Sequence, residues 1–126
     1  MPAAPRILAR ALLLGERLDH RGLPREGAPT FDPVPLATPE GFTAFAFRWG
    51  AVVFIGASVA QEAAVVEMLK PRLTNALPRP IEENAQIADG AEQDGVDADG
   101  VVRLRDLSIA RLATVADALA KSAALA

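Results

Sequence analysis

The stretch Gly41-Phe-Thr-Ala-Phe-Ala-Phe-Arg-Trp-Gly-Ala-Val-Val-Phe-Ile-Gly56 decides the fold of this 126-residue chain. It contains two apolar runs, Phe42 to Phe47 and Ala51 to Ile55, joined through Arg-Trp-Gly. A glycine in a short connection between apolar runs is typical of a β-hairpin. The stretch also holds four of the five phenylalanines and the only tryptophan. We therefore expect this hairpin to form the centre of a sheet.

The regions on either side of the hairpin predict further strands. The mostly apolar run Ile7 to Leu14 is typical of a strand buried on nearly both faces, although its Ala, Leu and Arg residues would also suit a helix. Residues 33–39 carry prolines, which cannot donate to a β ladder, so this segment fits only an edge strand. Weak alternation over 80–90 predicts an exposed edge strand, and residues 101–104 predict a short last strand.

Two amphipathic helices complete the predicted elements. Ser58 and Gln61 have the spacing of a capping box at the start of the first helix, and Pro71 ends it. Asp106 is the expected cap of the second helix. The apolar positions of that helix recur at helical spacing and are Ile109, Leu112, Val115 or Ala116, Leu119 and Ala123. Short connections between strands favour an antiparallel sheet, so we expect an α+β fold of about five to six strands with both helices packed on one face.

Length and composition indicate one domain over residues 1–126. Hydrophobic residues make up 51%, which excludes a disordered chain, and only the Pro- and Ala-rich residues 1–6 are expected to be disordered. The net charge of -3 provides no general attraction to nucleic acid, so no DNA partner is expected. The acidity is local, since Glu82 to Asp99 holds seven of the sixteen acids and no base, and residues 89–100 are predicted to form an acidic loop.

Two further observations narrow the class of protein. The chain has no cysteine, which excludes thiolate nucleophiles and zinc–thiolate sites and fits a reducing compartment. The longest apolar run, Ala51 to Ala57, is too short to cross a bilayer. We therefore expect a cytoplasmic chain.

His20 is the only histidine, and it lies close to two acids in the sequence, Glu16 and Asp19. These three residues could supply a general base or bind a small ligand, which would make the chain an enzyme or a ligand binder. The competing interpretation is a histidine on a surface turn, because no nucleophile motif accompanies it.

Arginines recur every four residues in the same region, at Arg17, Arg21 and Arg25. On a helix they would form a small basic stripe for phosphate or an acidic partner. Gly22 and Pro24 limit this region to a single helical turn, so ordinary solvated arginines are the competing interpretation.

The acidic segment partly matches a calcium-binding loop. Asp97 and Asp99, followed by Gly100, would take the second and third ligand positions and the turn. Gly95 stands at the first ligand position, however, and Asp106 replaces the glutamate expected at the last. A solvated acidic turn is therefore our interpretation, and we predict neither a metal site nor a cofactor.

Three pieces of the chain carry a family resemblance. They are Leu12-Leu-Leu-Gly-Glu-Arg-Leu-Asp-His-Arg-Gly-Leu23, Phe45-Ala-Phe-Arg-Trp-Gly-Ala-Val-Val-Phe-Ile-Gly56 and Asp99-Gly-Val-Val-Arg-Leu-Arg-Asp-Leu-Ser-Ile-Ala-Arg-Leu-Ala-Thr-Val-Ala-Asp-Ala-Leu-Ala-Lys-Ser122. In this order they resemble the conserved domain of unknown function in the "required for meiotic nuclear division" family, and the third piece is the most specific. Family members typically continue into further helices and a membrane-spanning segment. The resemblance therefore implies the N-terminal part of a longer protein.

The resemblance also implies a role without catalytic residues. We expect a non-catalytic interaction or assembly domain of a bacterial protein, as the soluble head of a membrane-anchored chain. Contact with the membrane would then come only through a segment outside this sequence. An RNA- or ribosome-associated module that supports translation is an alternative implied by the family alone.

The last predicted helix reaches the end of the sequence without a cap or stop signal. Either its end frays, or additional chain or a second subunit covers it. We expect the contact to be self-association or docking onto further C-terminal helices. The residues expected to make it are Leu112, Leu119, Ala123 and Leu125.

Overall fold

The computed structural model describes residues 6–19, 21–24, 33–38 and 41–125. Most of the segment predicted to be disordered lies outside these ranges, and Arg6 begins the first strand.

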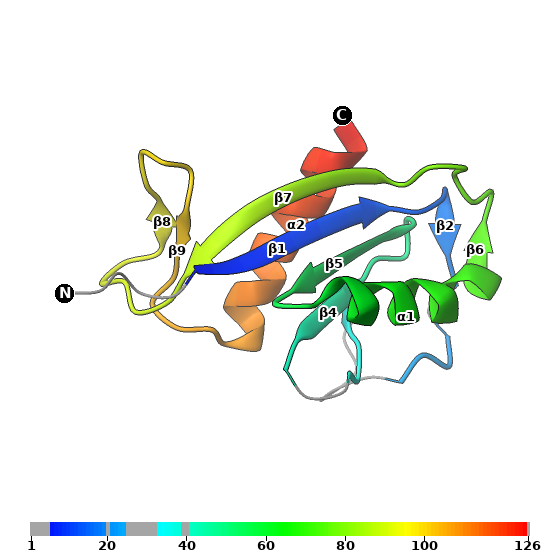
Figure 1. The fold of residues 1–126 in the computed structure, drawn as a ribbon, viewed down its shortest axis with the longest axis horizontal. Helices are drawn as coiled ribbons and strands as arrows, with labels where there is room; N and C mark the ends of the chain where they lie inside the picture. The colour runs from blue at the N-terminus through cyan, green and yellow to red at the C-terminus, as the bar shows by residue number, and fades with distance from the viewer. Residues whose placement is uncertain (1–5, 20, 25–32, 39–40, 126) are drawn as a thin grey trace.

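The described residues form two helices and nine strands, which Figure 1 shows arranged as two sheets. The strands are β1 (Arg6–Leu13), β2 (Arg17–Leu18), β3 (Val34–Pro35), β4 (Thr43–Ala46), β5 (Ala51–Ile55), β6 (Leu73–Thr74), β7 (Ile81–Ala88), β8 (Gly95–Val96) and β9 (Val102–Arg103). The helices are α1 (Val59–Leu69) and α2 (Ile109–Leu125), with a short 3-10 helix, η1 (Lys70–Arg72), after α1. The α+β class is confirmed.

The large sheet has seven strands in the order β3-β4-β5-β1-β7-β9-β8, and β2 pairs with β6 in a second sheet. The large sheet has more strands than the five to six predicted, because the acidic segment contributes an additional strand, β8. The sheet is mostly antiparallel, and among the described strands only β7 and β9 pair in parallel.

Strand β5 lies between β4 and β1 and carries the centre of the large sheet. Val53 pairs with Phe45 of β4 on one side and with Ala11 of β1 on the other. All five residues of β5 are buried. The predicted central hairpin is thus confirmed as β4–β5. The strand interpretation of the first apolar run is also confirmed, as β1.

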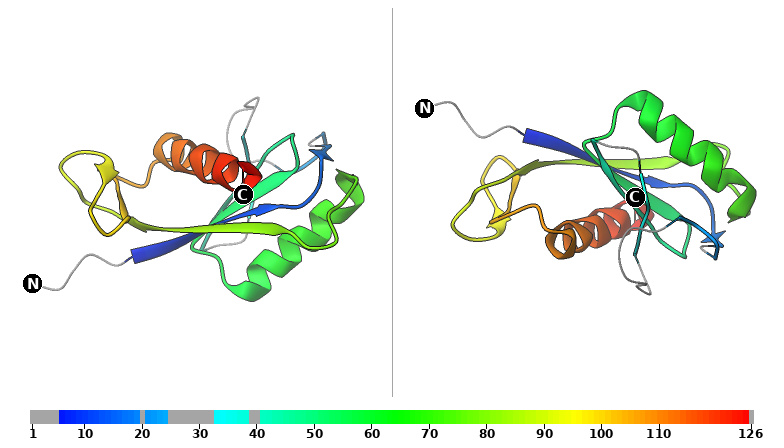
Figure 2. Two further views of the ribbon diagram at one scale, coloured as in Figure 1. Left: turned by 90° about the horizontal axis from the view of Figure 1, so that it is seen from above. Right: turned by 90° about the horizontal axis from the view of Figure 1, so that it is seen from below.

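Two hydrophobic clusters cover the two faces of this sheet. Val53 belongs to the cluster that contains residues of α2, whereas its neighbours Val52 and Phe54 belong to the cluster that contains residues of α1. Both views in Figure 2 show the helices on opposite sides of the sheet. The prediction that both helices pack on one face is therefore wrong. Because the central strands are apolar on both sides, each face needs its own covering layer.

The edge strands predicted from the sequence are found in part. The predicted proline-bearing edge strand is β3, at one end of the strand order. Strand β7, also predicted to be an edge, pairs with β1 along its whole length, from Ile81 opposite Leu13 to Ala88 opposite Arg6. On its other side, β9 reaches only Ile87 and Ala88. Most of β7 is therefore an edge, but its end lies inside the sheet.

The segment predicted to be an acidic loop contains β8 and the turn that leads into β9. Asp97 accepts hydrogen bonds from the backbone amides of Val101 (3.0 Å) and Asp99 (2.9 Å) and lies 2.7 Å from Arg103. These bonds, that of Val101 above all, hold the pKa of Asp97 below its usual range. The carboxylate of Asp97 therefore stabilises the turn between β8 and β9. Among the described residues, no group of three His, Cys, Asp or Glu side chains could hold a metal ion.

Arg111 joins this hairpin to the start of α2. Its guanidinium lies 3.0 Å from Asp94 and 2.9 Å from Asp106. Asp106 is not the helix cap that the sequence predicted. Ser108 directly precedes α2, and its hydroxyl accepts a 3.4 Å hydrogen bond from the backbone of Arg111, while Asp106 accepts from the backbone of Ser108 (2.9 Å).

A close backbone approach joins the β4–β5 turn to the start of β2. Gly50 has a φ of 99°, and a Cβ at this position would lie 2.1 Å from the carbonyl oxygen of Gly15. The amides of Leu14 and Leu18 donate 2.8 Å hydrogen bonds to the carbonyls of Gly50 and Arg48. Only glycine fits this geometry, so the position of β2 depends on Gly50.

We predict that Gly50→Ala lowers the free energy of unfolding by more than about 2 kcal/mol, because alanine at positive φ costs about 1 kcal/mol and the clash with Gly15 adds to it. Gly100→Ala is the matched control. Gly100 also has a positive φ (81°), but no described atom lies within 4 Å of the added Cβ. Chemical denaturation measures both losses, and equal losses would contradict the close approach.

Candidate functional site

A pocket of about 800 Å³ opens at the end of the molecule that carries β2 and β6. Three segments contribute to it: β2 with its flanking residues, the β4–β5 turn, and β6. The lining residues are Glu16, Arg17, Leu18, Asp19, Arg21, Arg48, Trp49 and Thr74. We call it the arginine pocket.

Backbone hydrogen bonds fix the walls of the arginine pocket. The amide of Glu16 donates to the carbonyl of Thr74 (3.0 Å), and the amide of Asp19 donates to the carbonyl of Arg72 (2.9 Å). The guanidinium of Arg72 in turn donates to the carbonyl of Arg21. Together these bonds set the spacing of the lining side chains.

The two carboxylates of the pocket are already engaged within the protein. Arg21 binds both oxygens of Asp19, at 2.9 and 3.0 Å, and this bonding holds the pKa of Asp19 well below its usual range. Glu16 accepts a 2.8 Å hydrogen bond from the side chain of Asn75. The side chain of Arg17 forms neither a hydrogen bond nor an ion pair with any other residue that the structure describes. Arg17 is therefore a charge that the pocket offers to a ligand.

The structure brings together two of the three residues that the sequence suggested for catalysis or ligand binding. Glu16 and Asp19 both line the pocket, whereas His20 lies outside the described residues, as does Arg25 of the suggested basic stripe. Because Arg21 keeps Asp19 ionised and bonded, Asp19 is a poor general base. Among the described residues of this region, a short strand and a turn replace the predicted helical turn.

Sequence reasoning did not place Arg48 and Trp49 in this site. They lie in the hairpin turn and reach the pocket only because that turn packs against β2. Trp49 also contacts Phe47, with ring centroids 5.3 Å apart and an interplanar angle of 52°. Two of the three pieces that carry the family resemblance, 12–23 and 45–56, therefore meet at this pocket.

The sequence did contain one signal for Trp49 as a site residue. It is a large aromatic residue in a tight turn, where small residues are usual.

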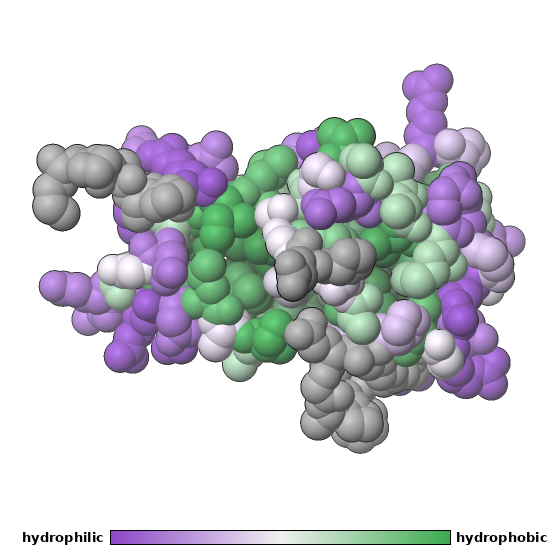
Figure 3. Space-filling model, turned by 60° about the horizontal axis from the view of Figure 1, so that its bottom comes forward, coloured by the Kyte–Doolittle hydropathy of each residue, from purple (hydrophilic) through white to green (hydrophobic). Residues whose placement is uncertain are grey.

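A second hollow, of about 370 Å³, lies between α1 and the chain around β3 and β4. We call it the α1 groove. Its lining residues are Leu36, Ala37, Thr38, Phe42, Ala60, Gln61, Ala64, Val65 and Met68. Figure 3 shows hydrophobic residues gathered across the middle of one face of the molecule, between hydrophilic residues at the β8–β9 and β2–β6 ends.

Both polar side chains in the α1 groove have partners within the protein. The hydroxyl of Thr38 donates to the carbonyl of Phe42 (2.8 Å). Gln61 and Ser58 exchange the two hydrogen bonds of a capping box, at 2.8 and 3.1 Å, which confirms the helix start predicted from the sequence. The lining therefore presents apolar surface and satisfied polar groups.

An ion pair with a buried glutamate attaches α1 to β1 of the sheet. Glu62 is only 7% exposed, and its carboxylate lies 3.3 Å from Arg10 of β1. Glu82 of β7 approaches the same guanidinium at 3.6 Å. Burial raises the pKa of Glu62, and this effect outweighs the attraction of Arg10.

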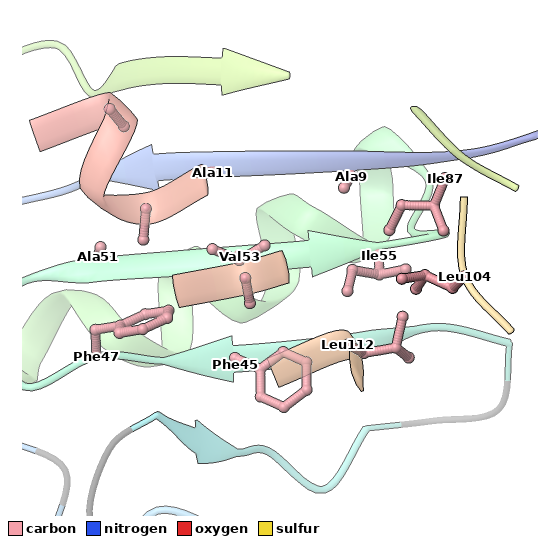
Figure 4. Close-up of a cluster of buried hydrophobic side chains, with 13 residues drawn as sticks. Ala9, Ala11, Phe45, Phe47, Ala51, Val53, Ile55, Ile87, Leu104 and Leu112 are labelled. Carbon is pink, nitrogen blue, oxygen red and sulfur yellow. The ribbon is translucent and has the colours of Figure 1, made fainter. Parts of the chain in front are cut away.

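The structure places most of the predicted α2 contact residues inside the domain. Leu112 and Ala123 are buried in the cluster that α2 forms with the sheet, and Leu119 packs against that cluster. Figure 4 shows Leu112 beside Phe45 and Ile55 of the sheet. Leu125 alone of the four is strongly exposed, at 88%. The apolar stripe of α2 thus serves the protein's own core.

No helix in the described part of the chain is both long and apolar enough to span a membrane. Comparison of the chain with protein-family models, curated proteins and solved structures gave no match.

We predict that the stability of Glu62→Gln relative to the wild type rises as the pH increases above about 4.5. The pKa of Glu62 is higher in the folded state than its ordinary value of 4.5, so protonated Glu62 favours the folded state. This contribution to the stability of the wild type is fully present below pH 4.5 and is lost as the pH rises through the raised pKa. Glutamine cannot ionise, so the variant avoids this loss.

Urea denaturation at several pH values measures the difference. Glu67→Gln is the control on the same helix, because the side chain of Glu67 is 69% exposed and pairs with Lys70, not with Arg10. A pH-independent difference for Glu62→Gln would show that burial does not disfavour its charge.

Proposed function

We propose that this chain is a non-catalytic interaction domain that self-associates through the α1 groove. The observation that carries this proposal is the groove's apolar lining, in which both polar side chains already have partners. Such a surface gains most by burying apolar side chains, at roughly 25 cal/mol per Å². The family resemblance favours the same class and extends it to the soluble head of a membrane-anchored bacterial protein.

The stripe of α1 that faces the groove is complementary to itself. Ala60, Ala64 and Met68 follow at four-residue spacing and so lie on one side of the helix. A twofold axis through Ala64 would place Met68 of each copy in the hollow beside Ala60 of the other. The small residues allow two antiparallel helices to approach closely, and the large one fills the space, as an isologous interface requires.

The test is the concentration dependence of molecular mass, measured by sedimentation. We predict that the wild type forms a dimer. For Ala64→Glu we expect the dissociation constant of the dimer to be at least about tenfold higher, because the twofold axis brings two carboxylates together in an apolar interface. The side chain is exposed, so the stability of the monomer should change by less than about 0.5 kcal/mol.

Ala63→Glu is the matched control, because Ala63 is exposed on the same helix but does not line the groove. It should associate like the wild type. A wild-type chain that stays monomeric at all concentrations, or equal effects of the two substitutions, would contradict self-association through the groove.

A further inference from the structure

The arginine pocket combines positive charge with an aromatic ring in a chain whose net charge is negative. Three arginines line it against two carboxylates, and both carboxylates already have partners. The pocket lies at the β2–β6 end, on lining residues that the α1 groove does not share. Binding here and the proposed self-association therefore use different residues.

We infer that the arginine pocket binds a phosphate monoester attached to a planar ring, the chemistry of a nucleoside monophosphate. Arg17 supplies a guanidinium that can bind two phosphate oxygens at once. Trp49 lines the same pocket, is partly buried, and is held on another side by Phe47, so its indole provides a fixed surface for a ring. The volume of about 800 Å³ suits a ligand of this size.

Glu16 selects among anions. It lines the pocket, and its partner Asn75 is neutral, so its charge would repel additional negative charge. A ligand with one phosphate can bind Arg17 and keep its other end uncharged, whereas a polyanion would bring several charges toward Glu16. Binding of a single phosphate ester is therefore favoured over binding of RNA.

Trp49 provides the measurement. It is the only tryptophan, and the chain has no tyrosine, so intrinsic fluorescence reports on this pocket. We expect adenosine monophosphate to change the emission saturably. Adenosine alone and inorganic phosphate alone should each bind at least about tenfold more weakly, because each makes only part of the contacts.

Arg17→Gln should weaken binding of adenosine monophosphate about tenfold or more, the loss expected for a charge-assisted hydrogen bond. Arg105→Gln is the control, because Arg105 is exposed at the β9–α2 connection, at the opposite end of the molecule. Thermal unfolding of both variants checks that the fold is intact.

Three results would overturn the inference. One is the lack of a saturable change with adenosine monophosphate, and another is an Arg17→Gln variant that binds like the wild type. The third is single-stranded RNA that binds more tightly than the mononucleotide and loses affinity steeply with salt, which would indicate a polyanion surface.

Discussion

The burial of β5 on both faces is the constraint on which the rest of the structure depends. Its five residues are all buried, and they alternate between a cluster shared with α1 and a cluster shared with α2. A strand of this kind must lie inside the sheet and needs a helix on each side. The chain meets this requirement by placing α1 directly after β5 on one face and bringing α2 back to the other. The positions of both candidate surfaces follow from this arrangement.

The two surfaces differ in chemistry because they lie at different boundaries of the same core. The α1 groove lies where a short helix covers the sheet next to the β3 edge, and its exposed small side chains leave an apolar hollow. The arginine pocket lies where the β4–β5 turn extends beyond the sheet and meets β2. There the backbone contact of Gly50 with Gly15 sets side chains from distant parts of the sequence next to one another. The proposed assembly surface and the proposed ligand pocket thus share no lining residues.

Local sequence patterns predicted most helices and strands. They did not predict how these elements pack, because packing depends on contacts between residues far apart in the sequence. The apolar runs around Trp49 predicted β4 and β5, and Ser58 with Gln61 predicted the start of α1. Each helix has an apolar stripe, but a stripe does not say which face of the sheet it covers, so the one-face packing was wrong. The acidic segment was predicted to be a solvated loop, whereas Arg103 and Arg111 bind its carboxylates. Glu16 and Asp19 line the same pocket because they are close in sequence. Trp49 was missed because its place in the pocket depends on a contact between turns.

The most direct test of this account is the pattern of methyl contacts made by two neighbouring valines of β5, read from nuclear Overhauser effects. The account predicts that the methyl groups of Val52 contact side chains of α1, whereas those of Val53 contact side chains of α2. Contacts from both valines to the same helix would contradict the placement of the helices on opposite faces, and with it the origin proposed here for both surfaces.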